Sequence, residues 1–247
     1  METVKTNNYE VEVKNLQISF GKDDVLTDLS LSLKKGENLV VLGKSGSGKS
    51  VLIKCIIGLI DPDEGTIMVQ GNNISEQDDN NLNLIRSKVG FLFQSAALYD
   101  SMTVRENLEF PLRRQNTVKG KKLTSLVEDA LENVGLSDVI DKMPSELSGG
   151  MRKRVGLART LILKPEIMLY DEPTTGLDPI TSTEISSLIV HIQKKYKTSS
   201  IIITHDIACT KNVADRIIVI RDGVCAAEGT YKELENSGDP WIRSFFE

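Results

Sequence analysis

Hydrophobic and polar residues alternate with a period of two in the N-terminal part of the chain. This pattern places every second side chain on one face of a β-strand, and it runs through "VEVKNLQISF" at residues 11–20 and "LSLSLKKGE" at residues 29–37. Polar turn residues follow in "GKDD" and "KKGE". We expect two half-buried strands of an antiparallel sheet, whose buried positions are Val11, Val13, Leu16, Ile18, Phe20, Leu29, Leu31 and Leu33.

Four other apolar runs are continuous instead of alternating. They are typical of strands that are covered on both faces of a parallel sheet, and stretches with helical spacing fall between them. The predicted fold class is therefore α/β, with a parallel sheet core beside the antiparallel part. The four runs are "NLVVLG", "EIMLYD", "SSIIITHD" and "RIIVIRDG".

The strand pattern fades between about residues 95 and 165, where apolar residues take helical spacing. We expect a helical subdomain here, inserted into a core formed by about residues 10–94 and 166–235, with a tail at 236–247; the whole chain, 1–247, is then one domain. The polar stretches "EQDDNNLNL" and "RRQNTVKGKKL" are predicted to be surface loops. The clearest helical positions are Leu123, Leu126, Val127, Ala130, Leu131 and Val134.

Composition narrows the class of protein. The formal net charge of -5 and the pI near 5.3 argue against a dedicated nucleic-acid binder, which usually has a basic excess. Cys55, Cys209 and Cys225 lie far apart and form no metal-binding pattern, so they are expected to be reduced core thiols. The start "METVKTNNYE" is polar, and no apolar run approaches the ~20 residues that span a bilayer. We expect no secretory signal and no membrane span.

Candidate chemistry begins at Gly43–Ser50, where "GKSGSGKS" follows an apolar strand and precedes an apolar helix pattern. The sequence fits the phosphate-loop pattern G-x-x-x-x-G-K-[ST], in which backbone N–H groups surround a triphosphate. Lys49 would reach the terminal phosphates, and Ser50 would ligate Mg²⁺. The pattern alone leaves ATPase, kinase and GTPase open. The binding residues expected here are Gly43, Lys44, Ser45, Gly46, Ser47, Gly48, Lys49, Ser50 and Val51.

Two carboxylates, Asp171 and Glu172, end another buried strand in "IMLYDEP". Because open α/β sheets bind ligands at the carboxyl ends of their strands, both should face the phosphates. We expect Asp171 to hold the Mg²⁺ shell and Glu172 to polarise the attacking water. His205 ends the next such strand and is placed to hydrogen-bond a γ-phosphate, whereas His191 lies in an ordinary helix pattern.

A second anion-binding helix end is predicted in "LSGGMRKRVGLARTLILKP". Ser148 fits an N-cap, Gly149 and Gly150 expose the backbone that follows, and the helix continues toward Pro165. One chain therefore carries two phosphate-binding helix ends.

These motifs together resemble the ATP-binding cassette family over about residues 10–235. Walker A at 43–50, Gln94 of the Q-loop, the signature at 147–151, Walker B at 167–172, the D-loop "GLDP" at 176–179 and the switch His205 follow one another in family order. The resemblance implies a P-loop NTPase fold with an antiparallel β subdomain and an inserted helical subdomain, and ATP with Mg²⁺ as cofactors. It also implies that Gln94 joins the Mg²⁺ shell, that Asp178 helps to bind ATP, and that Phe20 stacks on adenine, unless Phe20 is a core residue.

The resemblance further implies a dimer, in which the signature of one copy closes over the ATP of the other. A separate membrane permease would then dock a coupling helix at residues 95–112, and Gln94 would pass the loss of the γ-phosphate to the helical subdomain. For Leu108 and Phe110, ordinary core packing is an equal alternative. The protein would act at the cytoplasmic face of the inner membrane as a peripheral subunit.

The segments "FLFQSAALYDSMTVRENLEFPLR", "ELSGGMRKRVGLARTL" and "DEPTTGLDPITS" resemble one subfamily in particular. It comprises the lipid-transport ATPases of the maintenance-of-lipid-asymmetry type, and Met151 in place of the commoner glutamine agrees with it. The cargo implied is phospholipid, with a periplasmic mammalian-cell-entry-domain protein as a further partner. Another importer or a lipoprotein-release type complex is the alternative.

Other classes are less well supported. A GTPase should carry an N-K-x-D motif, which is missing from the sequence. A soluble cassette ATPase should carry tandem cassettes or a long coiled-coil insertion, and neither pattern appears in the sequence. We expect no nucleic-acid partner and interpret the basic clusters at Arg113, Arg114, 119–122 and 152–154 as solvated faces. The aromatic tail "GDPWIRSFFE" should dock either on its own domain or on a partner subunit.

Overall fold

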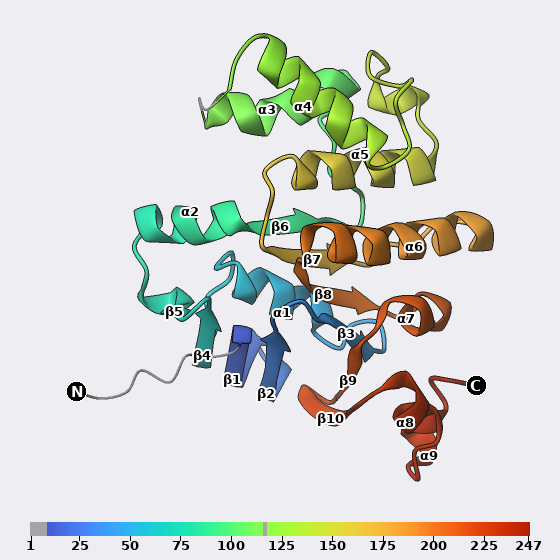
Figure 1. Ribbon diagram of the computed structural model, residues 1–247. Coiled ribbons are helices and arrows are strands. Elements are labelled where there is room, and N and C mark those ends of the chain that lie inside the picture. Colours follow the sequence, from blue (N-terminus) through green and yellow to red (C-terminus); the bar gives the residue numbers. More distant parts are fainter. Residues whose placement is uncertain (1–8, 116–117) are drawn as a thin grey trace.

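The structure is a computed structural model that describes residues 9–115 and 118–247 (Figure 1). Its strands form a 10-stranded sheet in the order β5-β4-β1-β2-β10-β9-β3-β8-β7-β6. The strands are β1 (Tyr9–Phe20), β2 (Asp23–Lys34), β3 (Asn38–Gly43), β4 (Glu64–Val69), β5 (Asn72–Asn73), β6 (Val89–Leu92), β7 (Ile167–Asp171), β8 (Ser199–Thr204), β9 (Arg216–Arg221) and β10 (Val224–Gly229). The helices are α1 (Lys49–Ile56), α2 (Asp79–Lys88), α3 (Val104–Arg114), α4 (Lys121–Glu132), α5 (Gly149–Leu161), α6 (Pro179–Tyr196), α7 (Ile207–Val213), α8 (Tyr231–Glu235) and α9 (Pro240–Arg243).

The four continuous apolar runs form the parallel part of the sheet, as predicted. β3 pairs with β8 and β9, and the parallel series continues from β8 through β7 to β6. Every residue of β3, β7 and β8 is buried. Val40 and Leu42 pack into one hydrophobic cluster and Leu39 and Val41 into another, on opposite faces of the sheet. Burial on both faces explains why these strands show no alternation.

The N-terminal alternation also gives the predicted antiparallel strands, since β1 pairs with β2 and with β4. The pairing register shifts between Val13 and Leu16, where Asn15 has a φ of 49°. This irregularity keeps both Val13 and Leu16 buried although they are three positions apart. Phe20 was predicted to continue the buried series and does not, because β1 ends there beside a turn and leaves the side chain 49% exposed.

Helices cover the two faces of the parallel strands differently. On one face, α1 packs with the antiparallel strands in a single cluster that includes Leu52, Ile53 and Ile67. On the other face, α3 to α7 contribute to one continuous cluster, and Figure 1 shows α3, α4 and α5 gathered beyond α6 at the top of the molecule. The helical pattern predicted around Leu123 is α4. None of the helices in the described part of the chain combines the length and the apolar character needed to cross a bilayer.

Two loop predictions need correction. The stretch "EQDDNNLNL" is largely helical, because α2 begins at Asp79 and Asp78 caps it by accepting a hydrogen bond from the Asn81 N–H at 2.8 Å. Asn and Asp disfavour helix interiors, so the sequence favours a loop here. The apolar side chains of α2 are only partly buried against the neighbouring hydrophobic cluster. The stretch "RRQNTVKGKKL" includes the last residues of α3 and the first of α4, and its residues 116–117 lie outside the described residues.

The C-terminal aromatic residues pack on their own domain. Ile242 is buried, and Trp241, Phe245 and Phe246 are partly buried against the cluster that contains α6 and α7. Trp241 also lies under the guanidinium of Arg221, 4.7 Å from the ring centroid. Contact of this tail with another subunit stays a prediction. Of the three free cysteines, Cys55 and Cys209 are buried as expected, and Cys225 is half-buried.

Candidate functional site

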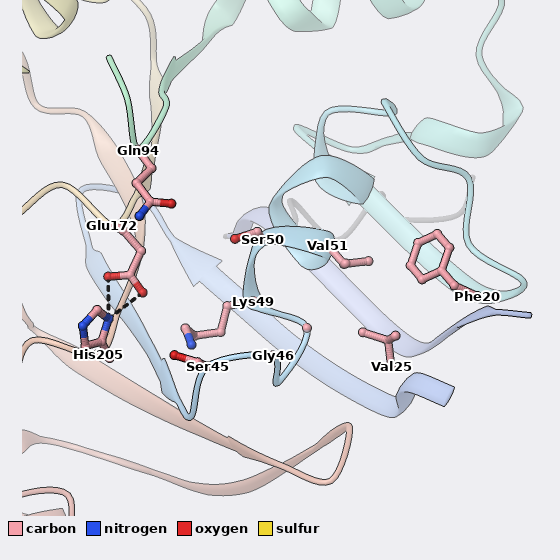
Figure 2. Close-up of a pocket in the computed structure, with 11 residues that line it drawn as sticks. Phe20, Val25, Ser45, Gly46, Lys49, Ser50, Val51, Gln94, Glu172 and His205 are labelled. Atoms are coloured by element: carbon pink, nitrogen blue, oxygen red, sulfur yellow. Dashed lines mark hydrogen bonds and ion pairs between the residues drawn. The ribbon is translucent and has the colours of Figure 1, made fainter. Parts of the chain in front are cut away.

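The carboxyl ends of four parallel strands meet at one edge of the sheet, and most of the predicted site residues follow them. β3 leads into the phosphate loop, β6 leads to Gln94, β7 ends at Asp171, and His205 follows β8. Ligands bind at this edge in open parallel sheets. A cavity of about 440 Å³ opens here (Figure 2), and it is lined by Phe20, Val25, Ser45, Gly46, Gly48, Lys49, Ser50, Val51, Gln94, Glu172 and His205.

The phosphate loop is shaped by its glycines. Gly46 and Gly48 have left-handed φ values of 81° and 89°, which glycine adopts without strain. Gly48 is the N-cap of α1 and provides no side-chain cap, so the first N–H groups of α1 point into the loop without a capping side chain. At Gly43, a Cβ would lie 2.5 Å from Ser47 Oγ. The loop is therefore a preformed anion site at a helix N-terminus.

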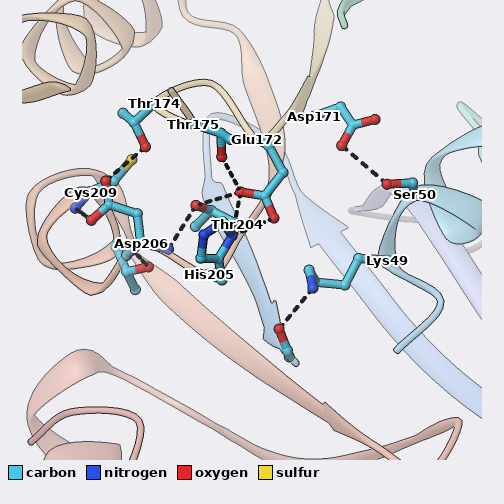
Figure 3. Close-up of polar contacts among 12 residues, drawn as sticks. Lys49, Ser50, Asp171, Glu172, Thr174, Thr175, Thr204, His205, Asp206 and Cys209 are labelled. Atoms are coloured by element: carbon cyan, nitrogen blue, oxygen red, sulfur yellow. Dashed lines mark hydrogen bonds and ion pairs between the residues drawn. The ribbon is translucent and has the colours of Figure 1, made fainter. Parts of the chain in front are cut away.

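Lys49 lies at the floor of this loop. Its Nζ donates to the carbonyl oxygens of Gly43 at 2.7 Å and Lys44 at 3.0 Å, and Figure 3 shows the side chain beside Ser50. Burial lowers the pKa of Lys49, and the nearby carboxylates of Glu172 and Asp171 oppose this shift. The ammonium is thus held inside the loop by backbone oxygens that a phosphate oxygen can replace.

Ser50 and Asp171 form the part of the site that fits a metal ion. The Ser50 hydroxyl donates to Asp171 Oδ1 at 3.2 Å, which joins α1 to the end of β7 (Figure 3). Burial raises the pKa of Asp171, while the Ser50 hydrogen bond opposes that shift. Hydroxyl and carboxylate oxygens are hard donors of the kind that Mg²⁺ prefers, and Mg²⁺ needs few protein ligands when phosphates supply others. The residues present therefore fit this ion.

Glu172 and His205 are in direct contact. His205 Nδ1 lies 2.9 Å from Glu172 Oε2 and 3.0 Å from Oε1, and the hydroxyls of Thr175 and Thr204 donate to Oε2 at 3.0 and 3.3 Å. Figure 3 shows these groups converging on the carboxylate from the loop after β7 and from the end of β8. The carboxylate is thereby held in place at the wall of the cavity, beside the Lys49 floor.

Phe20 and Gln94 lie at opposite ends of the cavity lining (Figure 2). The exposure of the Phe20 ring leaves room for stacking and makes the core alternative less suitable. Three residues of the predicted phosphate-loop set do not line this cavity. Lys44 and Ser47 line a neighbouring cavity of about 520 Å³ beside Trp241, and Gly43 closes β3 behind the loop.

The signature residues are not brought to this cavity. Ser148 is the N-cap of α5, and its Oγ accepts a hydrogen bond from the Met151 N–H at 3.3 Å, as predicted. Gly149 is exposed, but Gly150 is buried close to α6, where a Cβ on this residue would lie 2.5 Å from Thr181 Cγ2. Asp178 caps α6 and is also outside the cavity lining. A single chain thus separates two groups of predicted ATP-binding residues.

Three polar residues beside Glu172 were missed in the sequence. Thr175 and Thr204 bind its carboxylate, and no pattern distinguished them from other threonines. Lys153 was included in the basic cluster at 152–154 that was interpreted as a solvated helix face, and this is wrong for Lys153. Its side chain is 5% exposed and donates to the Glu172 carbonyl at 3.0 Å. Arg154 is also held, by the Val134 carbonyl and Glu184.

Comparison with known proteins agrees with this geometry. A family model described as "ABC transporter" matches residues 26–175, which is more than half of the chain. The chain is 40% identical over 235 residues to the "Probable ribonucleotide transport ATP-binding protein mkl" of Mycobacterium leprae, covering 95% of this chain and 68% of that protein. It is 37% identical over 255 residues to "Protein TRIGALACTOSYLDIACYLGLYCEROL 3, chloroplastic" of Arabidopsis thaliana, covering 95% and 72%. It is 37% identical over 238 residues to "Methionine import ATP-binding protein MetN" of Brucella abortus, covering 96% and 64%.

Solved structures show the same fold. A dimeric, post-hydrolysis state of the ATP-binding cassette MJ0796 bound to ADP and Pi has a TM-score of 0.81 at 32% identity, covering 89% of this chain and 98% of that one. CbiO1 of Clostridium perfringens, described as part of the ABC transporter complex cbiONQ, has a TM-score of 0.82 at 29% identity, covering 91% and 89%.

Proposed function

The chain belongs to the ABC transporter family, and from this membership we propose that it works as a dimer that closes on ATP and drives a separate membrane permease. An ABC transporter ATPase domain binds and hydrolyses ATP. The observation that carries the proposal is the separation of the signature from the nucleotide cavity within one chain. The chain spans about two thirds of the length of the mycobacterial relative.

Within the cavity, each residue has a role that follows from its contacts. The N–H groups of the phosphate loop and Lys49 bind the β- and γ-phosphates, with the ammonium exchanging the Gly43 and Lys44 carbonyls for phosphate oxygens. Ser50 and Asp171, with Gln94, would hold Mg²⁺. Bound Mg²⁺ neutralises charge that develops on the phosphates. Phe20 stacks on adenine at the far end of the cavity.

Hydrolysis is the task of Glu172. Its carboxylate accepts a hydrogen bond from the attacking water and polarises it, a role that typically contributes ~10² to 10⁴ in rate. Here the carboxylate is bound to His205, Thr175 and Thr204. Its acceptor positions are therefore partly occupied until His205 turns toward the γ-phosphate. When His205 moves from Glu172 to the γ-phosphate, the carboxylate can accept a hydrogen bond from water, so it becomes active only beside bound ATP.

The second half of the site comes from a second copy of the chain. Ser148, Gly149 and the N–H groups at the start of α5 form an exposed anion-binding helix end, and Asp178 lies at the start of the adjacent α6. Closure brings this surface onto the γ-phosphate held by the partner's phosphate loop. The dimeric state described for the MJ0796 cassette supports this arrangement.

The permease contact is proposed at the groove beside the Q-loop. A cavity of about 820 Å³ is lined there by Phe93, Ala97, Tyr99, Phe110 and Arg159, among others. Phe93 and Tyr99 are exposed, whereas Leu108 is fully buried and belongs to the core. The residues before α3 therefore suit a coupling helix better than Leu108 does. The description of CbiO1 as part of a transporter complex supports a permease partner.

For the cargo we propose phospholipid, moved between envelope membranes together with a periplasmic lipid-binding protein. The motifs around Gln94 and Met151 support this assignment, and so does the galactolipid in the printed name of the Arabidopsis relative. The names of the mycobacterial and Brucella relatives keep nucleotide or methionine transport as alternatives. The protein would act peripherally at the cytoplasmic face of the inner membrane.

The proposal is tested by affinity purification of the chain from native membranes in ATP, followed by identification of copurifying subunits and lipids. A permease, a periplasmic lipid-binding protein and phospholipid are the expected result. Recovery of a permease with a solute-binding protein and no enriched lipid would contradict the cargo. Recovery without any permease would contradict the transport function.

A further inference from the structure

Lys153 is a buried lysine on α5 that the proposed mechanism leaves without a role. Its Nζ donates to the Glu172 carbonyl at 3.0 Å, and within residues 9–115 and 118–247 the structure gives this ammonium no other protein acceptor. Burial lowers the pKa of Lys153 to about 8, against the opposing effect of the Asp171 and Glu172 carboxylates. Because burying an ammonium is costly, an apolar residue of similar length would pack here more easily. The presence of a lysine here therefore indicates that the Glu172 carbonyl needs a hydrogen-bond donor.

The acceptor belongs to an unusual peptide. Glu172 has a φ of 49°, in the left-handed region that a non-glycine residue adopts only under constraint. The next residue is Pro173, which disfavours helical conformations at the residue before it. Because proline has no N–H, the peptide between Glu172 and Pro173 has only its carbonyl with which to form a hydrogen bond. Lys153 binds that carbonyl.

The two sides of Glu172 are thus fixed by different elements. Its N–H donates to the Ile203 carbonyl of β8 at 2.9 Å, and its C=O accepts from Lys153 Nζ of α5 at 3.0 Å and from the Thr175 N–H of the following turn at 3.3 Å. These contacts on both sides of the residue orient the Cα–Cβ bond and so direct the carboxylate. Without Lys153, the carbonyl keeps only the longer hydrogen bond from the Thr175 N–H, and the strained peptide is held less firmly in the left-handed conformation.

We propose that Lys153 is a positioning residue for Glu172. Through this contact, the start of α5 influences the direction of the Glu172 carboxylate in the same chain. The inference rests on the proposed function, in which the start of α5 contacts the ATP of the partner. Ser148 caps the helix only five positions before Lys153. A displacement of α5 on contact with nucleotide therefore moves the Lys153 ammonium and, with it, the Glu172 peptide.

The test compares three substitutions of Lys153 in the full chain, with kcat, KM and nucleotide affinity measured for each. Lys153→Met keeps the unbranched apolar stem but lacks the terminal donor, and we expect kcat to fall about 10- to 100-fold while ADP affinity changes less than about twofold. Lys153→Arg keeps a donor and should stay within about threefold of the unmodified protein. Lys153→Gln is one bond shorter and should be intermediate. Lys122→Met, an exposed lysine on α4, is the matched control and should not change kcat.

Several results would overturn the inference. They are an unchanged kcat in Lys153→Met, a kcat in Lys153→Arg as low as in Lys153→Met, or a loss of ADP affinity as large as the loss of kcat. Should Lys153→Met fail to fold, Lys153→Leu, which also lacks a donor, decides, and an unchanged kcat there has the same consequence. Failure of the proposed function is seen separately, as absent ATP turnover in the unmodified chain or full turnover in Glu172→Gln.

Discussion

The N-termini of α1 and α5 are both proposed to bind phosphate, but their surroundings differ. α1 begins at Gly48 without a capping side chain, inside a cavity with Lys49 below it and Asp171 beside it. α5 follows its N-cap Ser148, whose Oγ accepts from the Met151 N–H, and Ser148 and Gly149 are exposed and do not line that cavity. The first end lies in a cavity with polar side chains around it, while the second is an exposed surface for which we propose a ligand held by another copy of the chain. Nucleotide binding and nucleotide turnover should therefore separate experimentally.

The strongest separation is expected for Glu172→Gln. Glutamine keeps the size of the side chain but lacks the carboxylate that polarises water, so hydrolysis should fall by ~10² to 10⁴. ATP binding at the α1 end should persist, and the closed dimer should accumulate. Turnover and size-exclusion chromatography in ATP measure both effects. Normal turnover would remove Glu172 from its proposed role.

Lys49→Ala should have the opposite signature and impair binding itself. The ammonium makes charge-assisted hydrogen bonds, each worth about 1.5 to 3 kcal/mol, and the loss of one weakens nucleotide affinity by about 10- to 100-fold. Titration with a fluorescent ATP analogue measures this change, with Lys122→Ala as an exposed control. An affinity within twofold of the unmodified protein would refute the α1 site as the primary phosphate contact.

At the α5 end, Gly150→Ala should reduce turnover without reducing affinity. The added Cβ would meet Thr181 Cγ2 at 2.5 Å and push α5 away from α6, which displaces the signature. We expect kcat to fall about 10-fold. Thr181→Ser removes the clashing methyl group and keeps the hydroxyl that binds Asp178, so the double variant should recover most of the loss. A double variant as slow as Gly150→Ala would show that the clash is not the cause.

The difference between the two helix ends was only partly predictable from the sequence. The phosphate loop and the Ser148 cap depend on local spacing, which a sequence displays directly. The packing of Gly150 against Thr181 and the burial of Lys153 depend on contacts between distant segments, so no sequence pattern indicated the first, and Lys153 was expected to be solvated. The helix α2 was missed because its local composition is typical of a loop. In the structure, the Asp78 cap and partial packing of its apolar side chains outweigh that local preference.

Phe20→Ala should give the smallest effect and sharpen the comparison at the α1 end. The ring is 49% exposed at the mouth of the cavity, beyond the reach of the phosphate contacts. Stacking of this kind is worth about 0.5 to 1.5 kcal/mol, so its loss should weaken ATP affinity by roughly 2- to 10-fold. Phe20→Tyr keeps an aromatic face and should retain the affinity, while inorganic triphosphate, which has no base, should bind both variants equally. If Phe20→Ala weakens triphosphate and ATP alike, the residue supports the loop and does not bind adenine. In that case, Phe20 at the end of β1 would belong to the phosphate-binding part of the site.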